Sequence, residues 1–321
     1  MPLPRLFTRR PRVFARPLRF LSTPSVTPVE LHETSQIPGD NATDGAVVIL
    51  RGILYASPSS HAGRVAKLNG QRLCTKLGRP LARVCAPPQQ ARIRACKLPL
   101  DSAGRADDGH WQDLRNHGAS AHTAAMNYSA MVADVMHFIR QRSLFNVCLI
   151  GHSMGGKVAI SVAFDPTLPV ETLSKLVVAD IAPAKGSLSA EFKSYIVAMQ
   201  KIEAAKVSSR KEALAILNEF ERDPDVCAFL LTNLVQKPEG GSHFRIPVNL
   251  IGAAIEEMGS FPFEPEERQW DGKTLFVKAS KSRYGRALRA ELDGNVSESY
   301  INRHNIPLAE KFFPNMRLET L

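Results

Sequence analysis

Leu149-Ile-Gly-His-Ser-Met-Gly-Gly-Lys157 is the most informative segment of this chain. It continues a short apolar run, residues 146–150, that predicts a buried strand, and it opens a segment that predicts a helix. A serine between Gly151 and Gly155 at such a junction is typical of a nucleophile elbow. Side chains two residues either side of the sharply turned serine would clash, so glycine is needed at both places. The sequence therefore predicts Ser153 as a nucleophile.

The start of the predicted helix offers a site for negative charge. The first N–H groups of a helix have no partner within it, and they lie at the positive end of its dipole. We therefore predict the N–H of Met154 as the first donor to an oxyanion.

Further apolar runs predict the rest of a parallel sheet, because continuous runs rich in β-branched residues suit strands that are buried on both faces. These runs are residues 45–50, 176–179, 274–277 and 316–321. Between them, Met131, Val135 and Phe138 share one face of a predicted helix over residues 128–142. Strands that alternate with helices predict an α/β fold with right-handed crossovers. A largely helical block then interrupts the alternation up to about Leu234, and it is typical of a cap over the sheet.

The charge of the chain is concentrated at its N-terminus. The net charge is +10, and residues 1–29 hold six arginines and no acid, so the remainder carries +4 (10 minus 6). An Arg-rich, acid-free segment with interspersed apolar residues predicts a mitochondrial presequence and a matrix location. The alternative is a basic tail or an arm that touches RNA. Because the remainder has a net charge that is ordinary for a domain of this size, we predict no nucleic-acid partner.

Other whole classes of protein are excluded by composition. No apolar run approaches the roughly 18 residues needed to span a bilayer. The five cysteines are scattered without a C-x-x-C pair, which supports neither a zinc site nor a disulfide framework. Hydrophobic residues make up 44% of the chain, as in an ordinary globular protein.

Three motifs together resemble the α/β-hydrolase superfamily. They are Gly151-His-Ser-Met-Gly-Gly-Lys157, Asp113-Leu-Arg-Asn-His-Gly118 and Asp180-Ile-Ala-Pro183. More narrowly, they resemble the small mitochondrial and bacterial esterases that include the fungal ethanol acetyltransferases. The resemblance covers residues 45–56 and 113–321. It implies a mostly parallel sheet flanked by helices with a helical cap, and a serine hydrolase or acyltransferase that acts on a small carboxylic ester or thioester. It implies no metal and no organic cofactor.

The resemblance also implies partners for Ser153. Asp180, at the end of the strand after the nucleophile helix, would orient a histidine, although a helix-capping role is the alternative. The second oxyanion donor would be the N–H of Ile53, in a loop where Arg51 replaces the histidine of the family. Apolar cap residues would line part of the acyl pocket, although each is more often simple core: Phe192, Ile196, Met199, Phe229 and Leu230.

The general base is not found. The family carries its catalytic histidine in a loop beyond the last strand, and this chain stops at Leu321 within that strand, so we expect the C-terminal end to be truncated. None of the nine histidines is assigned as the base. His117 is interpreted as a residue that structures its loop. As printed, the chain is expected to have very low activity.

The resulting domain organisation has five parts. They are a targeting segment at 1–29, a linker at 30–44, the first part of the hydrolase core at 45–184, the cap at 185–263 and an incomplete remainder of the core at 264–321. Residues 81–112 show neither the hydrophobic period of a helix nor that of a strand, and they are interpreted as an irregular insertion, such as a retained intron. A non-catalytic binding module with the same fold is the alternative function.

Overall fold

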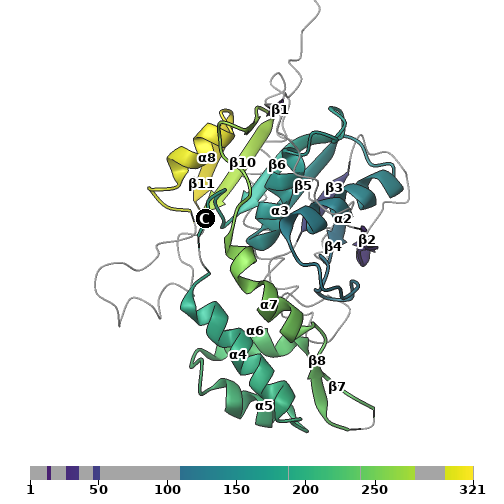
Figure 1. The fold of residues 1–321 in the computed structure, drawn as a ribbon, viewed down its shortest axis with the longest axis vertical. Coiled ribbons are helices and arrows are strands. Elements are labelled where there is room, and N and C mark those ends of the chain that lie inside the picture. Colours follow the sequence, from purple (N-terminus) through teal and green to yellow (C-terminus); the bar gives the residue numbers. More distant parts are fainter. Residues whose placement is uncertain are drawn as a thin grey trace, which may run out of the picture.

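The computed structural model describes residues 13–15, 27–35, 46–50, 109–186, 188–238, 240–278 and 301–320. Within them, a sheet of seven strands has the order β11-β10-β6-β5-β3-β4-β2. Helices α2 and α3 lie against this sheet, and a second lobe extends from one end of it (Figure 1).

Six adjacent strands of this sheet run parallel to one another, and they confirm the predicted α/β fold. They are β3 (Val47–Leu50), β4 (Gly109–Gln112), β5 (Val147–His152), β6 (Leu173–Ala179), β10 (Lys273–Lys278) and β11 (Met316–Thr320). β2 (Glu33–Ser35) pairs antiparallel with β4 at one edge. Side chains alternate between two buried faces, with Val48 and Leu50 in one core cluster and Ile49 in the other. This two-sided burial explains why the strands read as continuous apolar runs.

β4 corrects one boundary of the sequence analysis. The interpretation of residues 81–112 as an irregular insertion includes Gly109–Gln112, but these residues pair with β3 and β2. Four residues are too few for a visible alternation, and the strand is stabilised by neighbours on both sides. Residues 81–108 lie outside the described residues.

Three helices complete the described core: α2 (Tyr128–Gln141), α3 (Met154–Ala163) and α8 (Ile306–Phe312). The predicted helix over 128–142 is confirmed, and it begins where the Asn127 side chain accepts a hydrogen bond from the N–H of Ala130. An aromatic cluster joins α3 to α8, because Phe164 stacks on Phe312 and Phe313 at centroid distances of 5.5 and 5.2 Å.

The lobe below the sheet in Figure 1 is the cap. It contains α4 (Ala190–Ala204), α5 (Arg210–Leu217), α6 (Pro224–Leu230), a 3-10 turn η1 (Leu231–Asn233), β7 (Leu234–Gln236), β8 (Ser242–Phe244) and α7 (Val248–Gly259). The predicted helices are present, but the cap is not purely helical, because β7 and β8 form an antiparallel hairpin. Gly240 and Gly241 in its turn have φ of 96° and 81°, which only glycine adopts readily.

One further strand falls in the predicted targeting segment. β1 (Val13–Ala15) pairs antiparallel with β9 (Arg268–Trp270). In the described parts of the chain, every helix is too short or too polar to cross a bilayer.

Candidate active site

Ser153 occupies a strained turn between β5 and α3. Its φ and ψ are 53° and −123°, a conformation that a residue with a side chain rarely adopts. A Cβ at Gly151 would overlap the carbonyl group of Gly155, which explains the first glycine of the motif. Gly156 is a further requirement that the sequence analysis missed. A Cβ there would lie 2.5 Å from Cγ2 of Ile181, and the doubled glycine was the available signal.

The first turn of α3 closes on Ser153. The carbonyl oxygen of Ser153 accepts hydrogen bonds from the N–H groups of Gly156 (2.8 Å) and Lys157 (3.2 Å). Met154 is the first residue of the helix, so its N–H has no acceptor within the helix, as the predicted oxyanion role requires. The other predicted donor, Ile53, lies outside the described residues.

The structure brings Asp180 next to Ser153. Ser153 directly follows His152 on β5, and Asp180 directly follows Ala179 on β6. His152 and Ala179 are partners in the register of these parallel strands, which run about 4.8 Å apart. The N–H of Ser153 donates to the carbonyl of Ala179 at 3.0 Å. Asp180 also has a positive φ, 53°, and its N–H donates to Val277 on β10 at 2.8 Å. Ser153 and Asp180 are thus two of the six described non-glycine residues that have a positive φ.

His152, the residue before Ser153, interacts electrostatically with Asp180. Burial lowers the pKa of His152, and the Asp180 carboxylate partly offsets that effect. The neutral imidazole is therefore favoured at this edge of the sheet.

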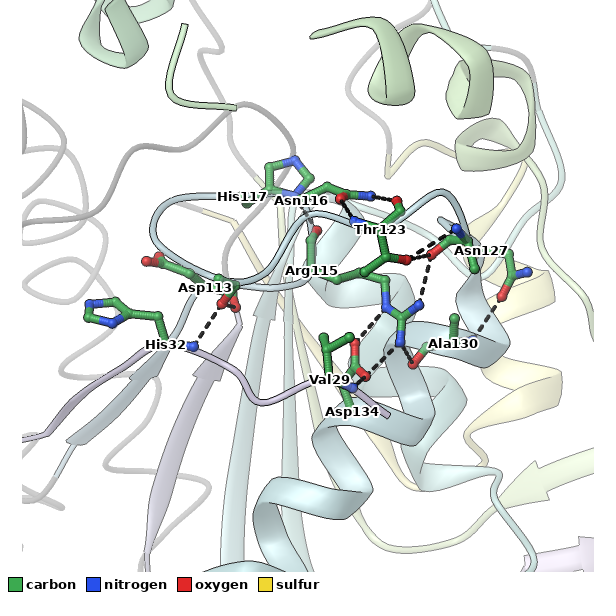
Figure 2. Close-up of polar contacts among 12 residues, drawn as sticks. Val29, His32, Asp113, Arg115, Asn116, His117, Thr123, Asn127, Ala130 and Asp134 are labelled. Atoms are coloured by element: carbon green, nitrogen blue, oxygen red, sulfur yellow. Dashed lines mark hydrogen bonds and ion pairs between the residues drawn. The ribbon is translucent and has the colours of Figure 1, made fainter. Parts of the chain in front are cut away.

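The loop that follows β4 is held by a buried ion pair (Figure 2). The guanidinium of Arg115 binds both carboxylate oxygens of Asp134 on α2, with Nε to Oδ2 and Nη2 to Oδ1 each at 2.7 Å. Arg115 also donates to the carbonyls of Ala125 and Ala130, and Asp134 accepts from the N–H of Val29. The sequence analysis used this loop only as a family marker, so the role of Arg115 and Asp134 was missed.

Asn116 and Gly118 shape the same loop. Asn116 has φ of 65°, and its side chain closes the loop by bonds to the backbone N–H and carbonyl of Thr123 at 2.7 and 2.9 Å. Gly118 has φ of 56°, and a Cβ there would overlap the carboxylate of Asp113. The Asp113–Gly118 motif therefore specifies backbone geometry.

His117 is fixed by this loop. Its Nδ1 lies 2.9 Å from the carbonyl oxygen of Arg115, and a carbonyl only accepts, so Nδ1 carries the proton. Burial lowers the pKa of His117 to about 4, so the ring is neutral at pH 7. In Figure 2 the ring points away from the Arg115–Asp134 pair. These contacts agree with the structural role that the sequence favours for His117.

Several known proteins are similar to this chain. Residues 116–219 match a family model described as a PGAP1-like α/β domain. The chain is 34% identical over 211 residues to the sn-1-specific diacylglycerol lipase ABHD11 of Xenopus laevis, covering 64% of this chain and 61% of that protein. It is 32% identical over 234 residues to an abhydrolase domain-containing protein of Schizosaccharomyces pombe, covering 72% and 77%. It is also 34% identical over 231 residues to a probable alcohol acetyltransferase of Saccharomyces cerevisiae, covering 66% and 61%.

A solved structure has the same fold. A marine microorganism esterase superposes with a TM-score of 0.63 over 91% of each chain, at 24% sequence identity. The chain spans about three fifths of the length of the ABHD11 relatives that it matches. The strand order, the elbow at Ser153 and the relationship to the fission-yeast protein agree with the resemblance found in the sequence. This chain belongs to the α/β-hydrolase superfamily.

Proposed function

We propose that this chain is a serine-dependent ester hydrolase or acyltransferase in which Ser153 forms an acyl-serine intermediate. The observation that carries the proposal is the backbone of Ser153, held at φ 53° between β5 and the first turn of α3. This geometry projects a serine side chain from the carboxyl edge of a parallel sheet, where substrates bind in α/β folds. The relatives named as lipase, esterase and acetyltransferase support a carboxylic ester as the substrate class.

The proposed reaction has two halves. Oγ of Ser153 attacks the acyl carbonyl carbon and passes its proton to a general base or, in its absence, to water, and the N–H groups of Met154 and Ile53 stabilise the oxyanion. The C–O bond to the leaving alcohol then breaks, and the alcohol departs with a proton. Water or a second alcohol attacks the acyl-serine, which releases an acid or a new ester and restores the Ser153 hydroxyl. Asp180 serves as the carboxylate that orients a protonatable base.

Among the described residues we assign no histidine as that base. Loss of the base from a serine hydrolase lowers kcat by several orders of magnitude, while binding and the oxyanion donors preserve some catalysis. We propose, from the sequence, that none of the nine histidines supplies this base, and turnover by the chain is then expected to be slow.

The test is covalent labelling of the folded chain by an alkyl fluorophosphonate, read by intact mass and peptide mapping. We expect one adduct on Ser153 and none in Ser153→Ala. Ser161→Ala is the matched control, because Ser161 is a buried serine on α3, the helix that follows Ser153, and its hydroxyl donates to the carbonyl of Lys157. A folded chain that stays unlabelled contradicts the proposal and favours the non-catalytic binding module.

Hydrolysis and acyl transfer are separated by the acceptor. A p-nitrophenyl ester is supplied with and without ethanol, and the acid and ethyl ester are quantified. An esterase yields mainly the acid at every ethanol concentration, whereas an acyltransferase diverts the acyl group to the ethyl ester. Ser153→Ala should abolish both products.

We also propose that residues 1–29 direct the chain to mitochondria. The support is their arginine content without acids. Fusion of these residues to a fluorescent protein should give mitochondrial fluorescence and a shortened product, and replacement of the six arginines by glutamine should leave the fusion in the cytosol.

A further inference from the structure

The chain enters and leaves the cap at one place, which we call the cap stem, residues 185–186 and 259–264. The N–H of Gly186 donates to the carbonyl of Gly259 at 3.1 Å. A Cβ at Gly259 would overlap the carbonyl oxygen of Gly186, so the two stretches need glycine to approach this closely. An ion pair between Lys185 and Glu264 also joins the two sides, but both side chains are more than half exposed.

Lys157 reaches the cap stem from the nucleophile helix. Its Nζ donates to the carbonyl oxygens of Gly259 at 2.8 Å and Ser260 at 2.9 Å. Its backbone N–H donates to the carbonyl of Ser153. The residue is only 5% exposed, and a lysine is rarely buried without such partners. One residue therefore connects the nucleophile backbone to the end of α7.

Tyr128 strengthens this connection from α2. Its hydroxyl donates to the carbonyl of Met258 at 2.8 Å, and its ring centroid lies 6.0 Å from Nζ of Lys157. The last carbonyl groups of a helix receive no hydrogen bond from N–H groups of the helix, and they carry its partial negative charge. Three consecutive carbonyls at the end of α7, residues 258–260, thus receive donors from the core, one of them a cation.

We infer that Lys157 is a positioning residue that fixes the cap to the nucleophile helix and thereby sets how the cap encloses the acyl group of the substrate. The part that concerns substrate rests on the proposed function. The part that concerns the cap stem does not, because it follows from the bonds of Lys157 alone. Lys157 touches no reacting atom in this assignment, so its effect passes through the cap.

The first test measures hydrogen exchange by mass spectrometry in peptides that cover the cap stem, using the full chain. Lys157→Met keeps the volume of the side chain but removes both charge-assisted bonds, so stem exchange should rise about tenfold or more. Lys157→Arg should restore part of the protection. Lys185→Met removes the exposed ion pair of the same stem and should match the unmodified chain. Stem exchange within twofold of the unmodified chain in Lys157→Met, or an equal rise in β5 and β6, would overturn the inference.

The second test measures kcat and KM on p-nitrophenyl esters of short and long acyl chains. In Lys157→Met, KM for the long ester should rise about fivefold or more while kcat and KM for the acetate stay within about twofold. A residue that acts only on stability would lower activity on both esters equally, and that result overturns the substrate part. If the unmodified chain neither hydrolyses esters nor reacts with the fluorophosphonate, the proposed function fails, and the exchange result still decides the role of Lys157 in the stem.

Discussion

The ion pair between Arg115 and Asp134 should be among the most sensitive sites in the chain. The two side chains are 1% and 0% exposed, and they share two bonds of 2.7 Å. Asp134→Ala would leave a guanidinium buried among the carbonyls of Ala125 and Ala130 without its counter-charge, and the N–H of Val29 would lose its acceptor. Breaking a buried pair by removing one partner costs about 3–5 kcal/mol.

This loss is a large share of the roughly 5–15 kcal/mol that stabilises a typical domain. Urea unfolding of Asp134→Ala, followed by circular dichroism, should therefore show a midpoint far below that of the unmodified chain. The control is Glu256→Ala, which breaks the ion pair between Glu256 and Lys193. These side chains are 69% and 42% exposed respectively, so the variant should change the free energy of unfolding by less than about 1 kcal/mol.

A double variant makes the reasoning sharper. Arg115→Met with Asp134→Leu removes both charges together, so it should recover part of the loss of the single variant. If Asp134→Ala unfolds within about 1 kcal/mol of the unmodified chain, burial and pairing are not what holds the loop. If the double variant loses more free energy of unfolding than the two single variants lose together, an uncompensated charge is not the cause of the loss.

Three further predictions concern the elbow, the buried lysine and the N-terminus. Gly151→Ala places a methyl group on the Gly155 carbonyl, so fluorophosphonate labelling of Ser153 should be lost while Gly186→Ala, a position with open space around it, labels normally. Burial lowers the pKa of Lys157 from 10.5 to about 8, so the unfolded chain holds more protons between these values and stability rises with pH there. The free energy of unfolding of the unmodified chain, relative to Lys157→Met, should increase by about 3 kcal/mol across that window, and a flat difference would contradict the shift. Removing residues 1–26 deletes β1 but keeps the bond from Val29 to Asp134, so the free energy of unfolding should fall by less than about 1 kcal/mol.

The sheet and the elbow were predictable because their signals are local. A strand buried on both faces needs a continuous apolar run, and a serine at positive φ needs glycine near it, so both leave a mark within ten residues. β4 left no such mark. Its four residues gain their structure from β3 and β2, which lie far away in the sequence.

The contacts of the candidate site were harder to predict for the same physical reason. The acceptors of Lys157 lie 102 and 103 residues further along the chain, and Tyr128 bonds a carbonyl 130 residues away. A lysine in the middle of an elbow motif gives no sign of partners at that distance. Asp180 was assigned from the resemblance, and its positive φ was not foreseeable from the residues around it.

The closeness of Gly186 and Gly259 also has a consequence for how such chains diversify. The two ends of the cap are joined by one hydrogen bond, between Gly186 and Gly259. The residues between them therefore form an insertion that begins and ends at one point of the core. We therefore expect changes in the length of the lobe to leave β6 and β10 in place, provided that residues 258–260 remain to accept the hydrogen bonds of Lys157 and Tyr128. If the proposed function holds, the part of the chain that encloses the acyl group is then exchangeable as a unit while Ser153 keeps its place on the sheet.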